Sequence, residues 1–232
     1  MTRGGGQLIV ALDFTTLRPA VAMARQLRGM ARTVKIGSAL FTASGPEAVR
    51  GLRALGFEVM LDLKFFDIPD TVEMSCRAAT ALRAALVTVH AAGGRVMLES
   101  AVRGARAEAR RLRIPRPKIL AVTVLTSAGK GQASSVRAQV IGRAREALRA
   151  GCDGVVASAQ EAAALRAAFG RGPLIVCPGI RPPGSARNDQ RRVMTPREAL
   201  VNGADRLVVG RPITAAARPR EAARTLLQAM EA

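Results

Sequence analysis

Apolar segments rich in β-branched residues recur eight times along the chain, and stretches with helical periodicity separate them. Short apolar runs bounded by polar turns are typical of strands buried on both faces. The predicted strands span residues 7–14, 33–38, 59–65, 86–92, 119–125, 154–158, 174–179 and 206–210. The Ala- and Arg-rich helical stretches between them include residues 17–29, 45–55, 70–84 and 134–150.

Eight strands that alternate with helices favour parallel pairing through right-handed crossovers. With 232 residues, the chain has the length of a closed (β/α)8 TIM barrel, and we expect residues 1–232 to form this single domain. A doubly wound open sheet is the competing α/β architecture, and it usually carries a glycine fingerprint after its first strand. The first strand here runs into "ALDFTTL" without those glycines, so the barrel is preferred.

Polar residues stand at the carboxyl ends of most predicted strands, where barrel enzymes place their chemistry. These residues are Asp13, Lys35, Asp62, Lys64, His90, Thr126, Ser127, Arg181 and Arg211. Several strand ends thus place polar groups at the same mouth of the barrel, which indicates an active site there.

The stretch "VMLDLKFFDIPD" (59–70) places charges inside an apolar run, where an unpaired ion is costly to desolvate. Strand alternation puts Asp62 and Lys64 on one face, and the apolar residues between them on the other. We expect the charged face to point into the barrel mouth. Lys35 shares the inward face of the neighbouring strand with Gly37, which leaves room beside the lysine.

This arrangement predicts an array of Lys35, Asp62, Lys64 and Asp67. One interpretation is a structural ion-pair network that closes the barrel top. The functional interpretation is an ammonium group held between carboxylates and ready to protonate a carbanion.

The last two predicted strands lead into "CPGIRP" (177–182) and "VVGRPI" (208–213), at the place where barrels often bind phosphate. Gly210 allows a close approach of the backbone, and Arg211 can donate two hydrogen bonds to an anion. Residues 180–194 form a long polar loop, which we interpret as a lid over a ligand phosphate.

The formal net charge is +19, from 36 Lys and Arg against 17 Asp and Glu. Clustered cations could indicate a non-catalytic nucleic-acid-binding protein. The arginines are instead spread over nearly every predicted helix, and stacking partners are scarce, with six Phe and no Tyr or Trp. We therefore expect no nucleic-acid binding, and interpret the charge as exposed helix residues that also attract anionic substrates.

Compartment and redox state follow from the termini and the cysteines. No apolar run approaches the roughly 18 residues of a membrane span. We interpret residues 1–6 as a loose tail, and the apolar run that follows them is too short for the core of a signal peptide. We expect a cytoplasmic protein with no membrane contact. Cys76, Cys152 and Cys177 are too scattered for a disulfide framework or a metal site, and are expected to be small buried residues.

An ordered set of motifs resembles the bacterial form of the orotidine 5′-phosphate decarboxylase family. The motifs are "VALDF" (10–14), "VKIGSALF" (34–41), "DLKFFDIPDT" (62–71), "VTVHAAGG" (87–94), "VLTS" (124–127), "CPGIRP" (177–182), "NDQRRVMTP" (188–196) and "GADRLVVGRPIT" (203–214). The resemblance implies decarboxylation of orotidine 5′-monophosphate to uridine 5′-monophosphate, the last step of de novo pyrimidine nucleotide synthesis, without metal or other cofactor.

The resemblance also implies roles for individual residues. Lys64 would protonate C6 of the pyrimidine after CO2 leaves, while Asp62 and Lys35 hold its ammonium group. Asp67 would lie near the substrate carboxylate, and Asp67 and Thr71 would both come from the partner subunit of a homodimer.

The remaining implied contacts bind the nucleotide. Asp13 and Lys35 would contact the ribose hydroxyls, Thr126 and Ser127 the ribose and base, and Arg181, Gln190, Gly210 and Arg211 the phosphate. Gln190 would also reach the base.

Two residues depart from the family pattern, because Phe66 stands where the family has histidine and Asp70 where it has asparagine. Neither is a catalytic position, so the contact between subunits is the feature they affect.

The nearest alternative is a magnesium-dependent sugar-phosphate decarboxylase or aldolase on the same barrel. Such relatives have an acidic residue at the position of Lys35, where a lysine would repel the metal.

Overall fold

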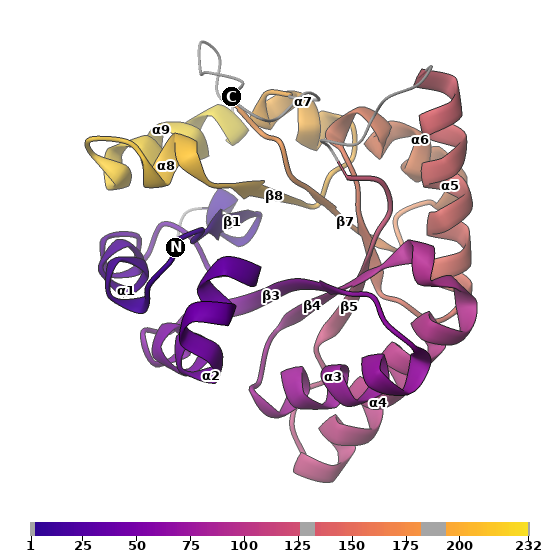
Figure 1. Cartoon of the computed structure of the whole chain (residues 1–232). Coiled ribbons are helices and arrows are strands. Elements are labelled where there is room, and N and C mark those ends of the chain that lie inside the picture. The colour runs from indigo at the N-terminus through magenta and orange to yellow at the C-terminus, as the bar shows by residue number, and fades with distance from the viewer. Residues whose placement is uncertain (1–2, 126–132, 182–193, 232) are drawn as a thin grey trace.

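The eight predicted strands form one closed parallel barrel, and helices surround it (Figure 1). The computed structural model describes residues 3–125, 133–181 and 194–231. The strands are β1 (Leu8–Ala11), β2 (Thr33–Gly37), β3 (Glu58–Phe65), β4 (Leu86–His90), β5 (Lys118–Val122), β6 (Gly154–Val156), β7 (Leu174–Cys177) and β8 (Arg206–Val209). Each observed strand lies within or next to its predicted range, which confirms the TIM-barrel fold.

The helices follow the strands in the expected alternation. They are α1 (Leu17–Gln26), α2 (Ser38–Ala54), α3 (Pro69–Ala81), α4 (Gly94–Leu112), α5 (Ala133–Arg149), α6 (Ala159–Phe169), α7 (Pro196–Val201), α8 (Arg211–Thr214) and α9 (Pro219–Glu231), with short 3-10 helices η1 (Arg3–Gly6) and η2 (Ala91–Gly93). Their starts follow local chemistry: Thr195 and Glu198 form a reciprocal capping box at α7, and Pro69 occupies the first turn of α3.

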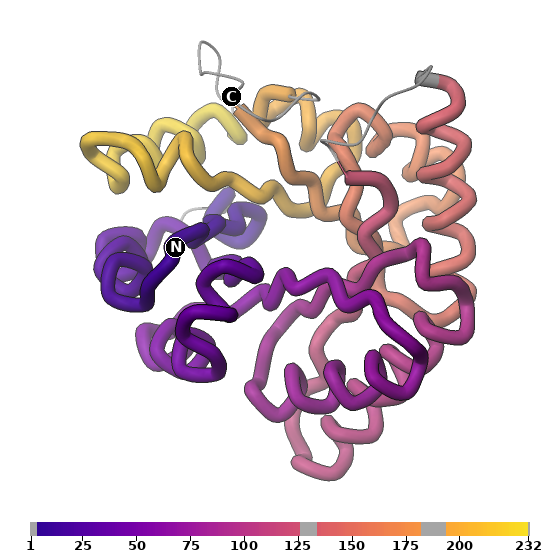
Figure 2. Tube along the Cα trace, viewed as in Figure 1, coloured from indigo at the N-terminus to yellow at the C-terminus, as the bar shows by residue number. Residues whose placement is uncertain are grey.

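The barrel closes where β8 pairs with β1, with Ile9 opposite Val208. Figure 2 shows this as the yellow C-terminal segment returning beside the indigo N-terminal one. All neighbouring strands are parallel, so all their carboxyl ends meet at one mouth.

Strand alternation divides the apolar side chains into two layers. The larger layer fills the space between strands and helices and contains outward-facing strand residues such as Val10, Ile36 and Leu61. The smaller layer fills the barrel interior with Ile9, Met60 and other inward-facing residues. This inner layer, called the apolar plug below, lies directly beneath the polar groups at the carboxyl ends of the strands.

The N-terminal segment differs from the expected loose tail. Residues 3–6 form η1, in which Gly4 is buried and lies against Leu227 of α9. The closed barrel brings the C-terminal helix next to this segment, so its order depends on a tertiary contact that a local pattern does not predict.

The three cysteines are free and buried, as predicted. Burial raises the pKa of Cys76, Cys152 and Cys177 to about 12 in each case, so the thiols stay protonated and unreactive. Across the part of the chain that the structure describes, no helix has both the length and the apolar character needed to cross a membrane.

Candidate active site

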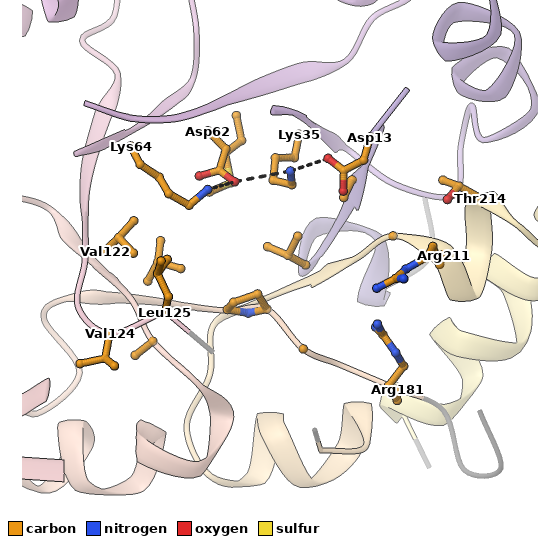
Figure 3. A pocket seen from close by; sticks show the side chains of 18 residues that line it. Asp13, Lys35, Asp62, Lys64, Val122, Val124, Leu125, Arg181, Arg211 and Thr214 are labelled. Atoms are coloured by element: carbon orange, nitrogen blue, oxygen red, sulfur yellow. Dashed lines mark hydrogen bonds and ion pairs between the residues drawn. The ribbon is translucent and has the colours of Figure 1, made fainter. Parts of the chain in front are cut away.

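A cavity of about 480 Å³ opens at the carboxyl ends of the strands. Polar side chains line two of its sides and apolar ones the rest (Figure 3). The polar lining residues are Asp13, Lys35, Asp62, Lys64, Arg181, Arg211 and Thr214, and the apolar ones include Met60, Val122, Val124, Leu125 and Val156. A mostly pre-formed pocket with a few convergent charges is typical of a small-molecule site.

Four charged side chains from three neighbouring strand ends form a continuous row along one wall (Figure 3). The Lys64 Nζ lies 2.9 Å from Asp62 Oδ2, and the same carboxylate oxygen lies 3.4 Å from Lys35 Nζ. Lys35 Nζ in turn donates a hydrogen bond of 2.8 Å to Asp13 Oδ1. Cations and carboxylates thus alternate from Lys64 to Asp13.

Burial and charge act in opposite directions on the centre of this row. Burial alone would lower the pKa of Lys35, but Asp62 and Asp13 outweigh it and the pKa is raised. Burial alone would raise the pKa of Asp62, but Lys35 and Lys64 outweigh it and the pKa is lowered. Both groups therefore stay ionised around neutral pH, so Asp62 is a permanent acceptor for two ammonium groups.

Thr88 on β4 holds the other oxygen of Asp62, a contact that the sequence interpretation missed. Its hydroxyl donates to Asp62 Oδ1 at 3.0 Å and accepts from the backbone N–H of Lys64 at 2.9 Å. One buried hydroxyl therefore orients the carboxylate and fixes the backbone of the lysine. The inward position of Thr88 within "LVTVH" was the only signal for it in the sequence.

Lys64 has a backbone conformation that strand alternation does not predict. Its φ is 50°, in the left-handed region that disfavours residues with a Cβ. The strand register shifts at this place, because Leu61 pairs with Val87 but Phe65 pairs with Val89. The resulting bulge directs the Lys64 side chain into the cavity, and such irregularities are common beside active sites.

Gly37 leaves the space beside Lys35 that the sequence indicated. A Cβ on this residue would lie 3.2 Å from Asp13 Oδ1 and 3.3 Å from Lys35 Nζ. Any side chain here would crowd the ion pair.

Within one chain, the structure does not bring Asp67 into the row or into the lining of the cavity. Asp67 is exposed, and its carboxylate accepts a hydrogen bond of 2.6 Å from the N–H of Ile68. The chain turns outward after β3 toward α3, and this carries Asp67 away from Lys64. Asp13 supplies the second carboxylate instead. Thr71 lies in the first turn of α3 and does not line the cavity.

Two arginines, Arg181 after β7 and Arg211 after β8, face each other across another side of the cavity (Figure 3). Arg181 is buried, and its Nη1 donates to the Ile180 carbonyl at 2.9 Å. Its Nε is also buried and has no hydrogen-bond partner among the described residues. Burial and the neighbouring charge of Arg211 lower the pKa of Arg181. Two guanidinium groups that line the same cavity can together bind an anion.

Gly210 lies beside this arginine pair and also lines the cavity. The predicted contacts Thr126, Ser127 and Gln190 lie outside the described residues, as does most of the predicted lid. The ends of that loop meet, because Ile180 bridges Met194 and the N–H of Arg181 donates to the Met194 carbonyl at 3.0 Å.

The whole chain is similar to known decarboxylases. The model of the orotidine 5′-phosphate decarboxylase / HUMPS family matches residues 6–226. The chain belongs to this family.

Individual relatives agree with this assignment. The orotidine 5′-phosphate decarboxylase of Anaeromyxobacter dehalogenans is 49% identical over 226 residues, which cover 95% of this chain and 96% of the relative. That of Halorhodospira halophila is 50% identical over 227 residues, covering 95% and 94%. The crystal structure of the Lactobacillus acidophilus enzyme superposes with a TM-score of 0.83 at 33% identity, covering 98% of this chain and all of that one.

Phe66, which departs from the family pattern, contacts the ring of His90. Its ring lies 5.2 Å from the ring of His90, centroid to centroid, at an interplanar angle of 31°. The His90 Nδ1 accepts a hydrogen bond of 3.2 Å from Ala92, and burial, Arg143 and Lys64 lower the pKa of His90. A neutral His90 suits this contact with the apolar ring of Phe66, which is otherwise exposed.

We predict that Asp62→Asn destabilises the protein by about 2 kcal/mol at pH 7, because two ammonium groups lose their shared carboxylate. The pKa of Asp62 is lower in the folded chain than its unfolded value of about 3.9. Its contribution to stability is therefore present above that value and disappears as the pH falls through the folded pKa.

Urea unfolding of both proteins between pH 7 and pH 3 measures this, and the difference between them should begin to shrink once the pH falls below the unfolded value. Asp70→Asn is the matched control, because Asp70 is exposed and contributes only its charge in the first turn of α3, so its difference should be clearly smaller. Equal stability of Asp62→Asn and the wild type at pH 7 would contradict the prediction.

Proposed function

We propose that this chain is an orotidine-5′-phosphate decarboxylase (EC 4.1.1.23), which converts orotidine 5′-monophosphate to uridine 5′-monophosphate and CO2. The observation that carries this proposal is the charged row with Lys64 at its end, on one side of a cavity whose other side holds the arginine pair. A pyrimidine nucleotide has the matching chemistry, since its phosphate is an anion remote from the reacting carbon.

In the proposed reaction, the bond between C6 and the carboxylate breaks and its electron pair stays on C6. The ammonium group of Lys64 then gives a proton to C6, and the neutral amine regains a proton from water. No ring position delocalises the pair well, so a cation aimed at C6 stabilises charge where it develops. The ion pair of 2.9 Å with Asp62 supports this role, because it fixes the position of the ammonium group.

Asp62 and Lys35 act in this scheme as the groups that hold Lys64. The raised pKa of Lys35 and the lowered pKa of Asp62 support it, because they keep the row charged throughout the reaction. Asp13 and Lys35 are proposed to contact the ribose hydroxyls, for which the exposed side of Asp13 is available. Thr126 and Ser127 are proposed to contact the ribose and base.

The phosphate is proposed to bind Arg181, Arg211, Gly210 and Gln190, with residues 180–194 as a lid and Gln190 also reaching the base. Binding energy from the remote phosphate would favour lid closure and exclusion of water, and can be realised in the transition state. The buried, unpartnered Nε of Arg181 supports an anion here, since a phosphate oxygen would satisfy it.

We propose that the reaction needs no metal or organic cofactor. A magnesium-dependent sugar-phosphate decarboxylase or aldolase is the alternative within the superfamily. The position of Lys35 argues against it, because its ammonium lies between Asp13 and Asp62 at 2.8 and 3.4 Å. A metal held by these carboxylates would have to displace that cation.

A homodimer with shared active sites is the proposed assembly. Four exposed apolar side chains support it: Phe66, Ile68, Met74 and Val96 are 61–66% exposed. Phe66 and Ile68 flank Asp67 on the loop after β3, Met74 lies on α3, and Val96 lies at the start of α4, which packs against α3. A patch of this kind marks a protein interface, and we propose that it delivers Asp67 and Thr71 to the site of the partner.

We further propose that the enzyme acts as a single 232-residue domain in the cytoplasm and binds no nucleic acid. The spread of arginines over many helices supports this last point. Tight, sequence-independent retention of nucleic acid on filters at physiological salt would contradict it.

The purified protein should decarboxylate orotidine 5′-monophosphate in the presence of a chelator, followed as loss of substrate absorbance. Lys64→Ala should lower kcat by at least about 10⁴-fold, because the proton donor and its charge are both lost. Circular dichroism should show an unchanged fold. Wild-type protein that is folded but inactive, or active only with added magnesium, would refute the assignment.

Arg211→Ala should raise KM for the nucleotide roughly 10- to 100-fold, because a charge-assisted pair of hydrogen bonds to phosphate is lost. Steady-state kinetics measure this. Arg224→Ala removes the same charge from an exposed position on α9 and should change KM by less than about twofold. An equal effect of both variants would indicate long-range attraction in place of direct contact.

Mixing two inactive variants tests the shared site. If Asp67 serves the partner, a heterodimer of Lys64→Ala and Asp67→Ala contains one intact site, and random subunit exchange should restore about a quarter of wild-type activity. Activity is measured after the mixture is equilibrated at high concentration. No recovery from exchanged subunits would show that Asp67 acts within its own chain.

A further inference from the structure

A second cavity lies at the opposite end of the barrel from the proposed active site. It has a volume of about 400 Å³, and the first residues of four strands contribute to its wall. These first residues are Glu58 of β3, Leu86 of β4, Lys118 of β5 and Arg206 of β8. The amino ends of barrel strands usually serve stability, so charged groups collected here need a separate explanation.

Five cations line this cavity, namely Arg53, Arg83, Arg116, Lys118 and Arg206. Glu58 is the single carboxylate among the described residues that line it. The wall between the cations is apolar and includes Leu86, Ile114 and Pro115.

Two of the cations have partners within the fold. Arg116 makes a bidentate pair with Asp153, at 2.8 and 2.6 Å. Arg206 lies 3.8 Å from Glu58, whose other oxygen accepts from Arg32 at 2.9 Å. Asp153 and Glu58 therefore neutralise Arg116 and Arg206, and they are already engaged in these pairs.

The other three cations, Arg53, Arg83 and Lys118, form no side-chain hydrogen bond or ion pair with any other described residue. They come from the end of α2, the turn after α3 and the start of β5. Three like charges gathered around one cavity repel each other, and an anion would relieve that repulsion.

Arg83 also has a backbone conformation that favours glycine. Its φ is 58°, and it follows α3 at the position where a helix terminates with backbone bonds from Arg83 N to Thr80 O and from Ala84 N to Ala79 O. The corresponding turns after α1, α2, α5, α6 and α7 have glycine at their positive φ: Gly29, Gly56, Gly151, Gly170 and Gly203. The turn after α4 also has an arginine, Arg113 with a φ of 52°, but Arg113 does not line the cavity. Arginine is disfavoured in this conformation by about 1 kcal/mol, so the two turns form a matched pair that differs in contact with the cavity.

We propose that this second cavity binds a polyphosphate anion, either the phosphate chain of a nucleotide or an inorganic polyphosphate. The unpaired cations come from separate elements around the cavity, so a chain of phosphates can contact several of them where a single phosphate cannot. The apolar wall offers a surface for a nucleobase. This site is separate from the proposed active site and does not depend on the proposed function.

The test is calorimetric titration of the full chain with tripolyphosphate at 0.15 M salt, in wild type, Arg83→Gly and Arg113→Gly. Arg113 is the matched control, because it ends α4 with a φ of 52° but does not line the cavity. Both variants remove one charge and one disfavoured conformation, so both should fold at least as well as the wild type.

Arg83→Gly should weaken tripolyphosphate binding about tenfold, the effect of losing one charge-assisted contact, while Arg113→Gly stays within about twofold of wild type. Equal effects of the two variants, or orthophosphate binding as tightly as tripolyphosphate, would overturn the proposal, as would no binding at all. Adenosine triphosphate serves as the second probe. An affinity equal to that of tripolyphosphate would show that the phosphate chain alone is recognised, and a higher affinity would show that the base also contacts the cavity. Both results support a polyphosphate site, and the decarboxylase activity of Arg83→Gly should be unchanged.

Discussion

The carboxylate of Asp62 is the interaction on which the site depends, because it holds two lysines from neighbouring strands at once. Two ammonium groups this close would repel each other without it. The parallel register of β2 and β3, in which Gly37 pairs with Asp62, sets the strand ends side by side. Thr88 then fixes the remaining oxygen. The proposed chemistry therefore depends on strand pairing, because the register of the strands positions each charged residue.

The rest of the barrel supports that row at a distance. The apolar plug below it excludes water from one side, and the arginine pair across the cavity provides a separate anchor for an anion. Within the row, Lys64 has the disfavoured backbone conformation, with a positive φ, and its N–H donates a hydrogen bond to Thr88. A rigid barrel can hold such a residue because its neighbours are fixed on both sides.

Most of the fold and part of the site could be predicted from the sequence. Buried strands leave a strong apolar signal, so all eight strands and the inward direction of Asp62 followed from it. The bulge at Lys64 depends on pairing with β4, and the outward path of Asp67 depends on where α3 begins. The order of η1 depends on contact with α9. These features arise from tertiary contacts, which a local pattern does not encode.

The most direct test of Lys64 as the proton donor to C6 uses the reverse proton transfer. The same amine should remove the C6 hydrogen of uridine 5′-monophosphate, so the wild-type protein should exchange it for solvent deuterium, seen as loss of the C6 proton signal in the NMR spectrum. With Lys64 as the donor, we predict exchange with the wild type and none above background with a Lys64→Ala variant that still binds the nucleotide. Equal exchange by both proteins would contradict the role of Lys64.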